Sequence, residues 1–158
     1  MTKEHHYKTN ITWTGNKGSG TKDYTTYERS YEVKVEQKTT ILGSSDAPFR
    51  GDISKHNPED FFLSSLSSCH MLWFLHLCAD KGIVVVSYED NAHGTMIENQ
   101  EGGGRFTSVM LNPKVVINDS NQIKQANELH AEANRKCFIA NSCNFTVHHH
   151  PICSVLTT

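Results

Sequence analysis

The chain has 158 residues and a mass of 17.8 kDa, which fits a single domain over residues 1–158 that can bury a sizeable core. Fifteen Lys and Arg against 17 Asp and Glu give a formal charge of -2, which argues against a nucleic-acid partner, because such proteins usually show a basic excess. No run of 18 apolar residues is present, and residues 1–10 lack an apolar signal segment. We therefore expect a cytoplasmic protein with no membrane partner.

The N-terminal third predicts β-strands. Aromatic and β-branched residues alternate loosely with polar ones, which indicates strands at residues 7–13, 24–35 and 39–42. The first two flank a glycine-rich turn at residues 15–20 and therefore suggest a hairpin. Residues 43–56 contain Pro48 and Gly51 and are typical of a loop.

A long apolar helix is predicted from Pro58 to Lys81. Asn57 can cap its first turn, Pro58 suits the first helical position, and the two acidic residues that follow oppose the positive end of the helix. Gly82 is expected to end the helix. Apolar side chains leave almost no polar face, which favours a helix that is buried on several sides.

The second half of the chain predicts further strands and one more helix. We expect strands over residues 83–88, on through residue 96, and over 106–117, then a helix over 120–140 and a last strand over 144–150. The resulting order is β-β-(β)-α-β-β-α-β. This order predicts an α+β fold with mostly antiparallel pairing.

Five cysteines are an odd number and poor material for a disulfide framework in a reducing compartment. Cys69 lies in the middle of the apolar helix, either as a small buried apolar residue or as a nucleophile that a nearby cation activates. Cys78 falls on the opposite face of that helix and is expected in the core. Cys137, near the end of the second helix, could meet Cys69, but the five cysteines allow ten pairs and spacing does not choose among them.

The ten histidines raise the question of a metal site. In the run His148–His150 the outer two share a strand face and His149 points away. The sequence has no Cys-x-x-Cys and no His-Glu-x-x-His, so we expect no metal and interpret the run as a solvated tail. A metal-binding protein that uses the run with Cys143 or Cys153 is kept as an alternative. Three other histidines fit hydrogen-bonded core or interface positions: His70, His76 and His130.

Residues 57–70, NPEDFFLSSLSSCH, resemble the helix-opening signature of the OsmC/Ohr family, the osmotically inducible and organic hydroperoxide resistance proteins. The family pattern is Asn-Pro-Glu with a cysteine ten residues after the glutamate, which Glu59 and Cys69 match. The second family cysteine falls near the end of the second long helix, where Cys137 stands. The resemblance implies an OsmC-like fold, with mostly antiparallel sheets packed around two long central helices in an intertwined homodimer.

The resemblance also implies an antioxidant enzyme, a thiol-dependent peroxidase that reduces organic hydroperoxides to alcohols. Cys69 matches the reactive cysteine, Cys137 the resolving cysteine and Glu59 the motif's glutamate. Arg50 matches the arginine of the OsmC branch, whereas the Ohr branch has its arginine nearer Lys17. Arg50 would stabilise the Cys69 thiolate, and Glu59 would hold the guanidinium group. No bound cofactor is implied, and the reductant is expected to be an external dithiol of the lipoyl type.

The chain departs from the family at the second cysteine. The family context Cys-Pro-x-Ser reads Cys137-Phe138-Ile139-Ala140 here, which indicates a divergent subgroup. Cys143 is therefore kept as the alternative resolving cysteine. The apolar surroundings of Cys69 favour an organic hydroperoxide over hydrogen peroxide. Because a fold does not fix a function, a non-catalytic small-molecule-binding protein on the same fold is the alternative function.

Overall fold

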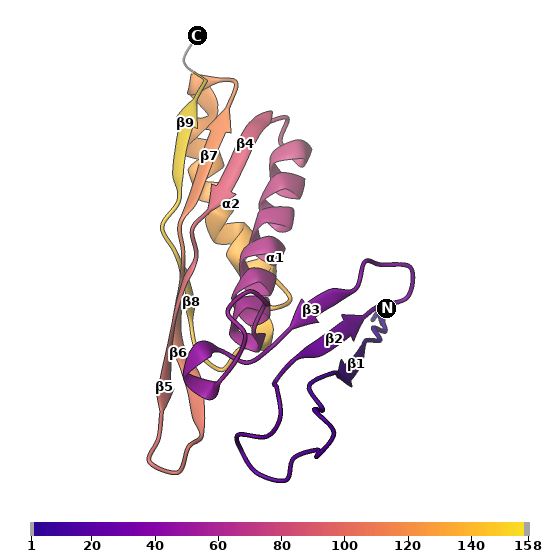
Figure 1. The fold of residues 1–158 in the computed structure, drawn as a ribbon. Coiled ribbons are helices and arrows are strands. Elements are labelled where there is room, and N and C mark those ends of the chain that lie inside the picture. Colours follow the sequence, from indigo (N-terminus) through magenta and orange to yellow (C-terminus); the bar gives the residue numbers. More distant parts are fainter. Residues whose placement is uncertain (1, 157–158) are drawn as a thin grey trace. The chain divides into compact units, whose positions relative to one another are not determined.

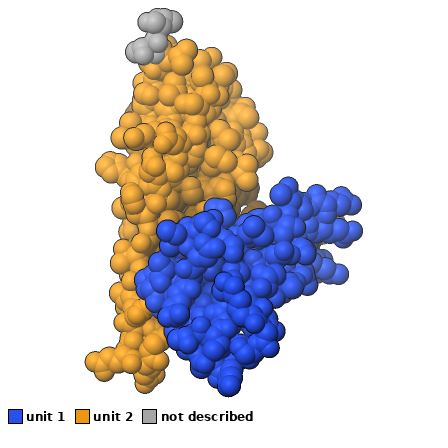
Figure 2. All heavy atoms as spheres, in the orientation of Figure 1, with its two compact units in different colours: residues 1–61 blue, residues 62–158 orange. Residues whose placement is uncertain are grey.

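A computed structural model describes residues 2–156 and divides the chain into two compact units. Unit 1 is Met1–Phe61 and unit 2 is Phe62–Thr158 (Figure 2). The expectation of a single domain over residues 1–158 stays a prediction.

Unit 1 is built on a three-stranded antiparallel sheet in the order β1-β2-β3 (Figure 1). Its strands are β1 (Asn10–Trp13), β2 (Tyr31–Lys34) and β3 (Ile41–Gly43), followed by the short 3-10 helix η1 (Ala47–Phe49). Ile11 pairs with Val33 and Val33 pairs with Ile41. Residues directly opposite each other point to the same face of a sheet, so the three form one apolar row across it.

The predicted strand over residues 24–35 is wrong in its first half, because residues 24–27 form turns and bends and residues 28–30 form no regular element. The guanidinium carbon of Arg29 lies 4.2 Å from the ring centres of both Tyr24 and Tyr27. The same group donates hydrogen bonds of 2.7 Å to the carbonyl oxygens of both tyrosines. These contacts satisfy the carbonyls locally and favour the turns over a sheet ladder.

The long helix α1 (Pro58–Asp80) begins where the sequence predicts and ends one residue earlier than expected. The Asn57 side chain accepts a bond of 2.7 Å from the Asp60 amide, and the Asp60 carboxylate accepts one of 3.1 Å from the Asn57 amide. This reciprocal capping fixes the first turn. Gly82 has a φ of +69°, the left-handed conformation that commonly ends a helix.

The burial of α1 differs from the expected burial on several sides. In the single chain only one stripe is buried, at Leu66, His70, Phe74, Leu77 and Cys78, whereas Leu72 is 62% exposed. By length and composition α1 could cross a membrane, with a mean hydropathy of 1.3 over an 18-residue window. The serines and histidines break up any continuous apolar run along the helix. Core helices have the same composition, and the buried stripe of α1 packs on both cores of unit 2.

Unit 2 contains two three-stranded sheets, in the orders β4-β7-β9 and β5-β6-β8. Their strands are β4 (Val85–Asp90), β5 (His93–Glu98), β6 (Gly104–Leu111), β7 (Pro113–Ile117), β8 (Val147–His149) and β9 (Ile152–Val155). The β4–β7 and β5–β6 pairs are antiparallel, and the β6–β8 and β7–β9 pairs are parallel. Three segments of the chain each run from one sheet into the other (Figure 1).

The predicted strand over residues 106–117 is therefore two strands, which separate at Asn112. The Asn112 amide donates a 2.7 Å bond to the Asp90 carboxylate, and its side chain donates a 2.9 Å bond to the Asn91 carbonyl. Pro113 lies at the break between β6 and β7, and Pro151 lies at the break between β8 and β9. At these positions the missing N–H of proline does not interrupt a sheet. Strand β9, which lies beyond Pro151, was not expected from the sequence.

Helix α2 (Ile123–Lys136) follows the 3-10 turn η2 (Ser120–Gln122) and is shorter than the predicted helix over residues 120–140. It ends because Cys137 adopts an extended conformation with φ -66° and ψ 112°. The short 3-10 helix η3 (Ala140–Ser142) follows. The α+β fold class and the two long helices of the prediction are confirmed.

Unit 2 has two apolar cores, one against each sheet. The first brings Phe74 of α1 together with Val115 of β7 and Ala133 of α2, and the second joins Leu66 of α1 to β6 and β8. Helix α1 thus carries the packing of both sheets, with its C-terminal half on one core and Leu66 on the other.

Leu66→Ala is expected to lower the free energy of unfolding by about 2–5 kcal/mol, because it removes a side chain that is 0% exposed and leaves a cavity. Urea unfolding followed by circular dichroism measures the change. Leu72→Ala, on the exposed side of the same helix, is the matched control and should cost about 0.5 kcal/mol or less. Equal losses for the two variants would contradict the described packing.

Candidate active site

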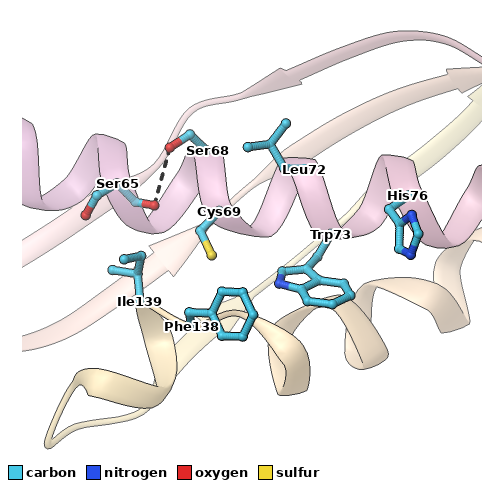
Figure 3. A pocket seen from close by; sticks show the side chains of 8 residues that line it. All are labelled: Ser65, Ser68, Cys69, Leu72, Trp73, His76, Phe138 and Ile139. Atoms are coloured by element: carbon cyan, nitrogen blue, oxygen red, sulfur yellow. Dashed lines mark hydrogen bonds between the residues drawn. The ribbon is translucent and has the colours of Figure 1, made fainter. Parts of the chain in front are cut away.

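Cys69 lies in an apolar groove of about 450 Å³ within unit 2 (Figure 3). One wall is a single side of α1, and the other is the segment that follows α2. The groove is lined by Ser65, Ser68, Cys69, Leu72, Trp73, His76, Phe138 and Ile139. Cys69 is half-buried, and its sulfur points across the groove toward the second wall. A thiol with both access and an apolar surrounding is thereby present.

Cys137 lies close enough to Cys69 for the two thiols to interact. Burial and the neighbouring Cys69 side chain together raise the pKa of Cys137 to about 11. Cys137 is therefore protonated at neutral pH.

The end of α2 positions the Cys137 sulfur. The Cys137 amide donates to the Asn134 carbonyl at 3.3 Å, and the Ala140 amide donates to the Cys137 sulfur at 3.4 Å. The Asn141 amide donates a bond of 3.0 Å to the Cys137 carbonyl. These contacts hold the thiol at the helix end although the proline and serine of the family pattern are absent.

The other three cysteines have their own surroundings. The Cys143 thiol donates to the Ile139 carbonyl at 3.4 Å and packs on the second core, and burial raises its pKa. Cys78 is buried as expected, and burial raises the pKa values of Cys78 and Cys153 to about 11. In all three thiols burial thus favours the protonated form.

Arg50 and Glu59, the other two predicted site residues, belong to unit 1. Arg50 follows η1 with a φ of +63° and lines a polar pocket of about 260 Å³, while Glu59 lies in the first turn of α1. Within the described part of unit 1, residues 2–61, the two do not form the expected ion pair. Their parts in activating Cys69 stay predictions, because Cys69 lies in the other unit.

A buried histidine pair lies one residue away from Cys69. His70 Nε2 and His130 Nδ1 are 3.0 Å apart, and both side chains are 0% exposed. The His130 ring stacks on Phe74 with 3.8 Å between ring centres, and the His149 ring centre lies 5.5 Å from that of His70. Burial lowers the pKa of His70 to about 4 and that of His130 to about 3, so both are neutral at pH 7.

The histidine expectations are confirmed in part. His70 and His130 are hydrogen-bonded core residues, whereas His76 is exposed and lies 3.5 Å from the Asp80 carboxylate. The interpretation of the His148–His150 run as a solvated tail is wrong for His149, which β8 turns inward. The alternation of strand side chains was the signal for this. In residues 2–156 no three His, Cys, Asp or Glu side chains are placed to hold a metal ion.

Comparison with known proteins gives one family. The family model of OsmC-like proteins matches residues 51–150. The structure of an OsmC-like protein of unknown function from Vibrio cholerae is 31% identical to this chain, with a TM-score of 0.84, and the match covers 94% of this chain and 100% of that one. No curated protein matches the sequence.

Two structures of lower identity share the fold. An organic hydroperoxide resistance protein from Elizabethkingia anophelis is 18% identical with a TM-score of 0.67, and the match covers 98% of this chain and 100% of that one. An organic hydroperoxide resistance protein from Legionella pneumophila is 19% identical with a TM-score of 0.66, and the match covers 96% of this chain and 100% of that one.

Proposed function

Because the chain belongs to the OsmC-like family, we propose that it is a thiol-dependent peroxidase that reduces organic hydroperoxides to alcohols. The observation that carries the proposal is the proximity of the Cys69 and Cys137 thiols beside an apolar groove. A half-buried thiol that lies next to a second, buried thiol is suited to react first and then to form a disulfide.

The reaction divides into three balanced steps. The Cys69 thiolate attacks the outer peroxide oxygen, the O–O bond breaks, and the leaving alkoxide takes a proton to become the alcohol. The Cys69 sulfenic acid then condenses with the Cys137 thiol, which forms the disulfide and releases water. An external dithiol, which we expect to be of the lipoyl type, reduces this disulfide by two thiol exchanges and is itself oxidised.

The surroundings of the two thiols support these roles. Cys137 is 1% exposed and its raised pKa keeps it protonated, so it is a poor first nucleophile. Cys69 is half-buried and faces the groove, where a peroxide can reach it. Cys143 donates to a carbonyl on the second core, so Cys137 is the better resolving cysteine.

The groove supports an organic substrate because its lining is almost entirely apolar. Leu72, Trp73 and Ile139 offer hydrocarbon surface next to the sulfur, which a peroxide with an apolar group would bury. Hydrogen peroxide has no such group and gains nothing from this surface.

Consumption of peroxide in the presence of dihydrolipoamide tests the proposed function. The purified protein is expected to catalyse the reaction over many turnovers, with a higher kcat/KM for cumene hydroperoxide than for hydrogen peroxide. Equal values would contradict the preference for organic hydroperoxides. No turnover with any dithiol would contradict the enzyme and favour a small-molecule-binding protein.

We also propose that the protein works as a homodimer in the cytoplasm. The sheet of unit 1 presents an apolar face with a groove of about 570 Å³, where Ile11 is 57% and Ile41 40% exposed. Both apolar cores of the described residues lie in unit 2. Within unit 1, therefore, no apolar core covers this face. A second copy of the chain would cover such a face.

The homodimer predicts a mass in solution of about twice 17.8 kDa, independent of dilution through the micromolar range. Ile41→Asp is expected to lower the mass toward that of one chain, because a carboxylate would be buried in the interface. Light scattering after gel filtration measures both, and Lys38→Asp, on an exposed turn, is the control. A wild-type mass of one chain at all concentrations would contradict the dimer.

A further inference from the structure

Phe138 holds an aromatic ring at the edge of the groove without packing into either core. Its side chain is 69% exposed, although it directly follows the buried Cys137. Both cores of unit 2 form without it, since neither includes Phe138. The ring therefore lines the groove and does little else for the stability of unit 2.

Among the described residues, Phe138 makes one aromatic contact, which is with Trp73. Their ring centres are 5.7 Å apart and the ring planes meet at 70°, an edge-to-face pair. Trp73 is held from other sides, because His76 meets it edge-to-face at 5.7 Å and the Lys136 ammonium lies 5.5 Å from its ring centre. Trp73 is thus a fixed wall, and Phe138 stands against it with much of its ring uncovered (Figure 3).

Each of the two rings lies close in sequence to one of the two cysteines. Trp73 lies one helical turn after Cys69 on the same side of α1, and Phe138 is the neighbour of Cys137. A planar ring that packs against Trp73 and Phe138 would therefore hold its attached peroxide group beside the Cys69 sulfur. The groove volume of about 450 Å³ is within the range of small-molecule pockets.

We propose that Phe138, together with Trp73, is a specificity-determining residue that makes this site prefer hydroperoxides bearing an aromatic ring over those bearing only a branched alkyl group. The inference rests on the proposed function for its reaction. It goes beyond that function because it names the recognised group and the residues that recognise it. Apolar area alone would favour both kinds of substrate, whereas edge-to-face and offset stacking favour the aromatic one.

The test compares cumene hydroperoxide with tert-butyl hydroperoxide, which lacks the ring. Phe138→Leu keeps an apolar side chain and is expected to lower the ratio of the two kcat/KM values by about fivefold, as the loss of one aromatic contact implies. Phe138→Tyr keeps the ring and should restore most of the ratio. A ratio that stays unchanged in Phe138→Leu would overturn the proposal.

A binding experiment separates this proposal from the proposed function. Fluorescence of Trp73 reports binding of 2-phenyl-2-propanol, the alcohol product of cumene hydroperoxide, with tert-butanol as the ringless control and Trp73→Phe to identify the signal. The dissociation constant for the aromatic alcohol is expected to rise about fivefold in Phe138→Leu. If wild-type protein binds this alcohol selectively but consumes no peroxide, the proposed function fails and the recognition stands. If Phe138→Leu binds it as tightly as wild type does, the recognition fails.

Discussion

Replacing Cys69 by serine is expected to abolish peroxide consumption, with kcat/KM falling by about a thousandfold or more. A serine hydroxyl is not ionised near neutral pH, so it cannot attack the peroxide oxygen as a thiolate does. Cys137→Ser should behave differently, because Cys69 still reacts once with peroxide but has no neighbouring thiol to condense with. Its turnover with a dithiol is expected to fall tenfold or more, and Cys69 should proceed to the sulfinic acid with excess peroxide.

Stopped-flow mixing with cumene hydroperoxide measures the first step, and a coupled dithiol assay measures turnover. Cys143→Ser is the matched control, since its thiol is half-buried and bonded to the Ile139 carbonyl, and it should leave both rates near wild type. Full activity of Cys69→Ser would show that Cys69 is not the cysteine that attacks the peroxide. If Cys143→Ser lost turnover while Cys137→Ser kept normal turnover, Cys143 and not Cys137 would be the resolving cysteine.

The free energy of unfolding is expected to fall by about 3–5 kcal/mol between pH 7 and pH 4.5 because of the buried histidine pair. An unfolded histidine takes up its proton near pH 6.5, whereas the buried pKa values of His70 and His130 are about 4 and 3. Between these values the unfolded chain binds more protons than the folded one. Stability is therefore complete above pH 6.5 and is lost as the pH falls below it, by about 1.4 kcal/mol per pH unit for each histidine.

Urea unfolding at pH 7, 6, 5 and 4.5 measures this slope. The double variant His70→Leu/His130→Phe should lose most of the dependence, because leucine and phenylalanine do not titrate and the new ring can stack on Phe74. His148→Gln, which removes an exposed histidine, should keep the wild-type slope. A double variant with the wild-type slope would show that other groups cause the acid sensitivity.

Local signals in the sequence predicted α1 well. Asn57, Pro58 and Gly82 act over a few residues, and the structure shows the cap and the end that they imply. The helix ends at Asp80, one residue before the predicted end at Lys81. The boundaries of the strands depended on contacts that the sequence does not show, such as Arg29 over its two tyrosines and Asn112 bonded to Asp90.

The site was predictable only through the family motif. Spacing left ten cysteine pairs open, and the contact of Cys69 with Cys137 depends on how α2 packs against α1. The histidine pair shows the same limit, because His70 and His130 are sixty residues apart and neither has a spacing signal. Alternation in the predicted last strand already set His149 apart from its two neighbours, but it did not show which face of that strand is buried.

Mass spectrometry of peptides after one equivalent of cumene hydroperoxide tests the contact between Cys69 and Cys137 most directly. We expect one new disulfide, between Cys69 and Cys137, which dihydrolipoamide reverses, with Cys78, Cys143 and Cys153 left as free thiols. A Cys69 sulfenic or sulfinic acid without that disulfide would contradict the resolving role of Cys137. Five unreacted thiols would contradict the peroxidase itself.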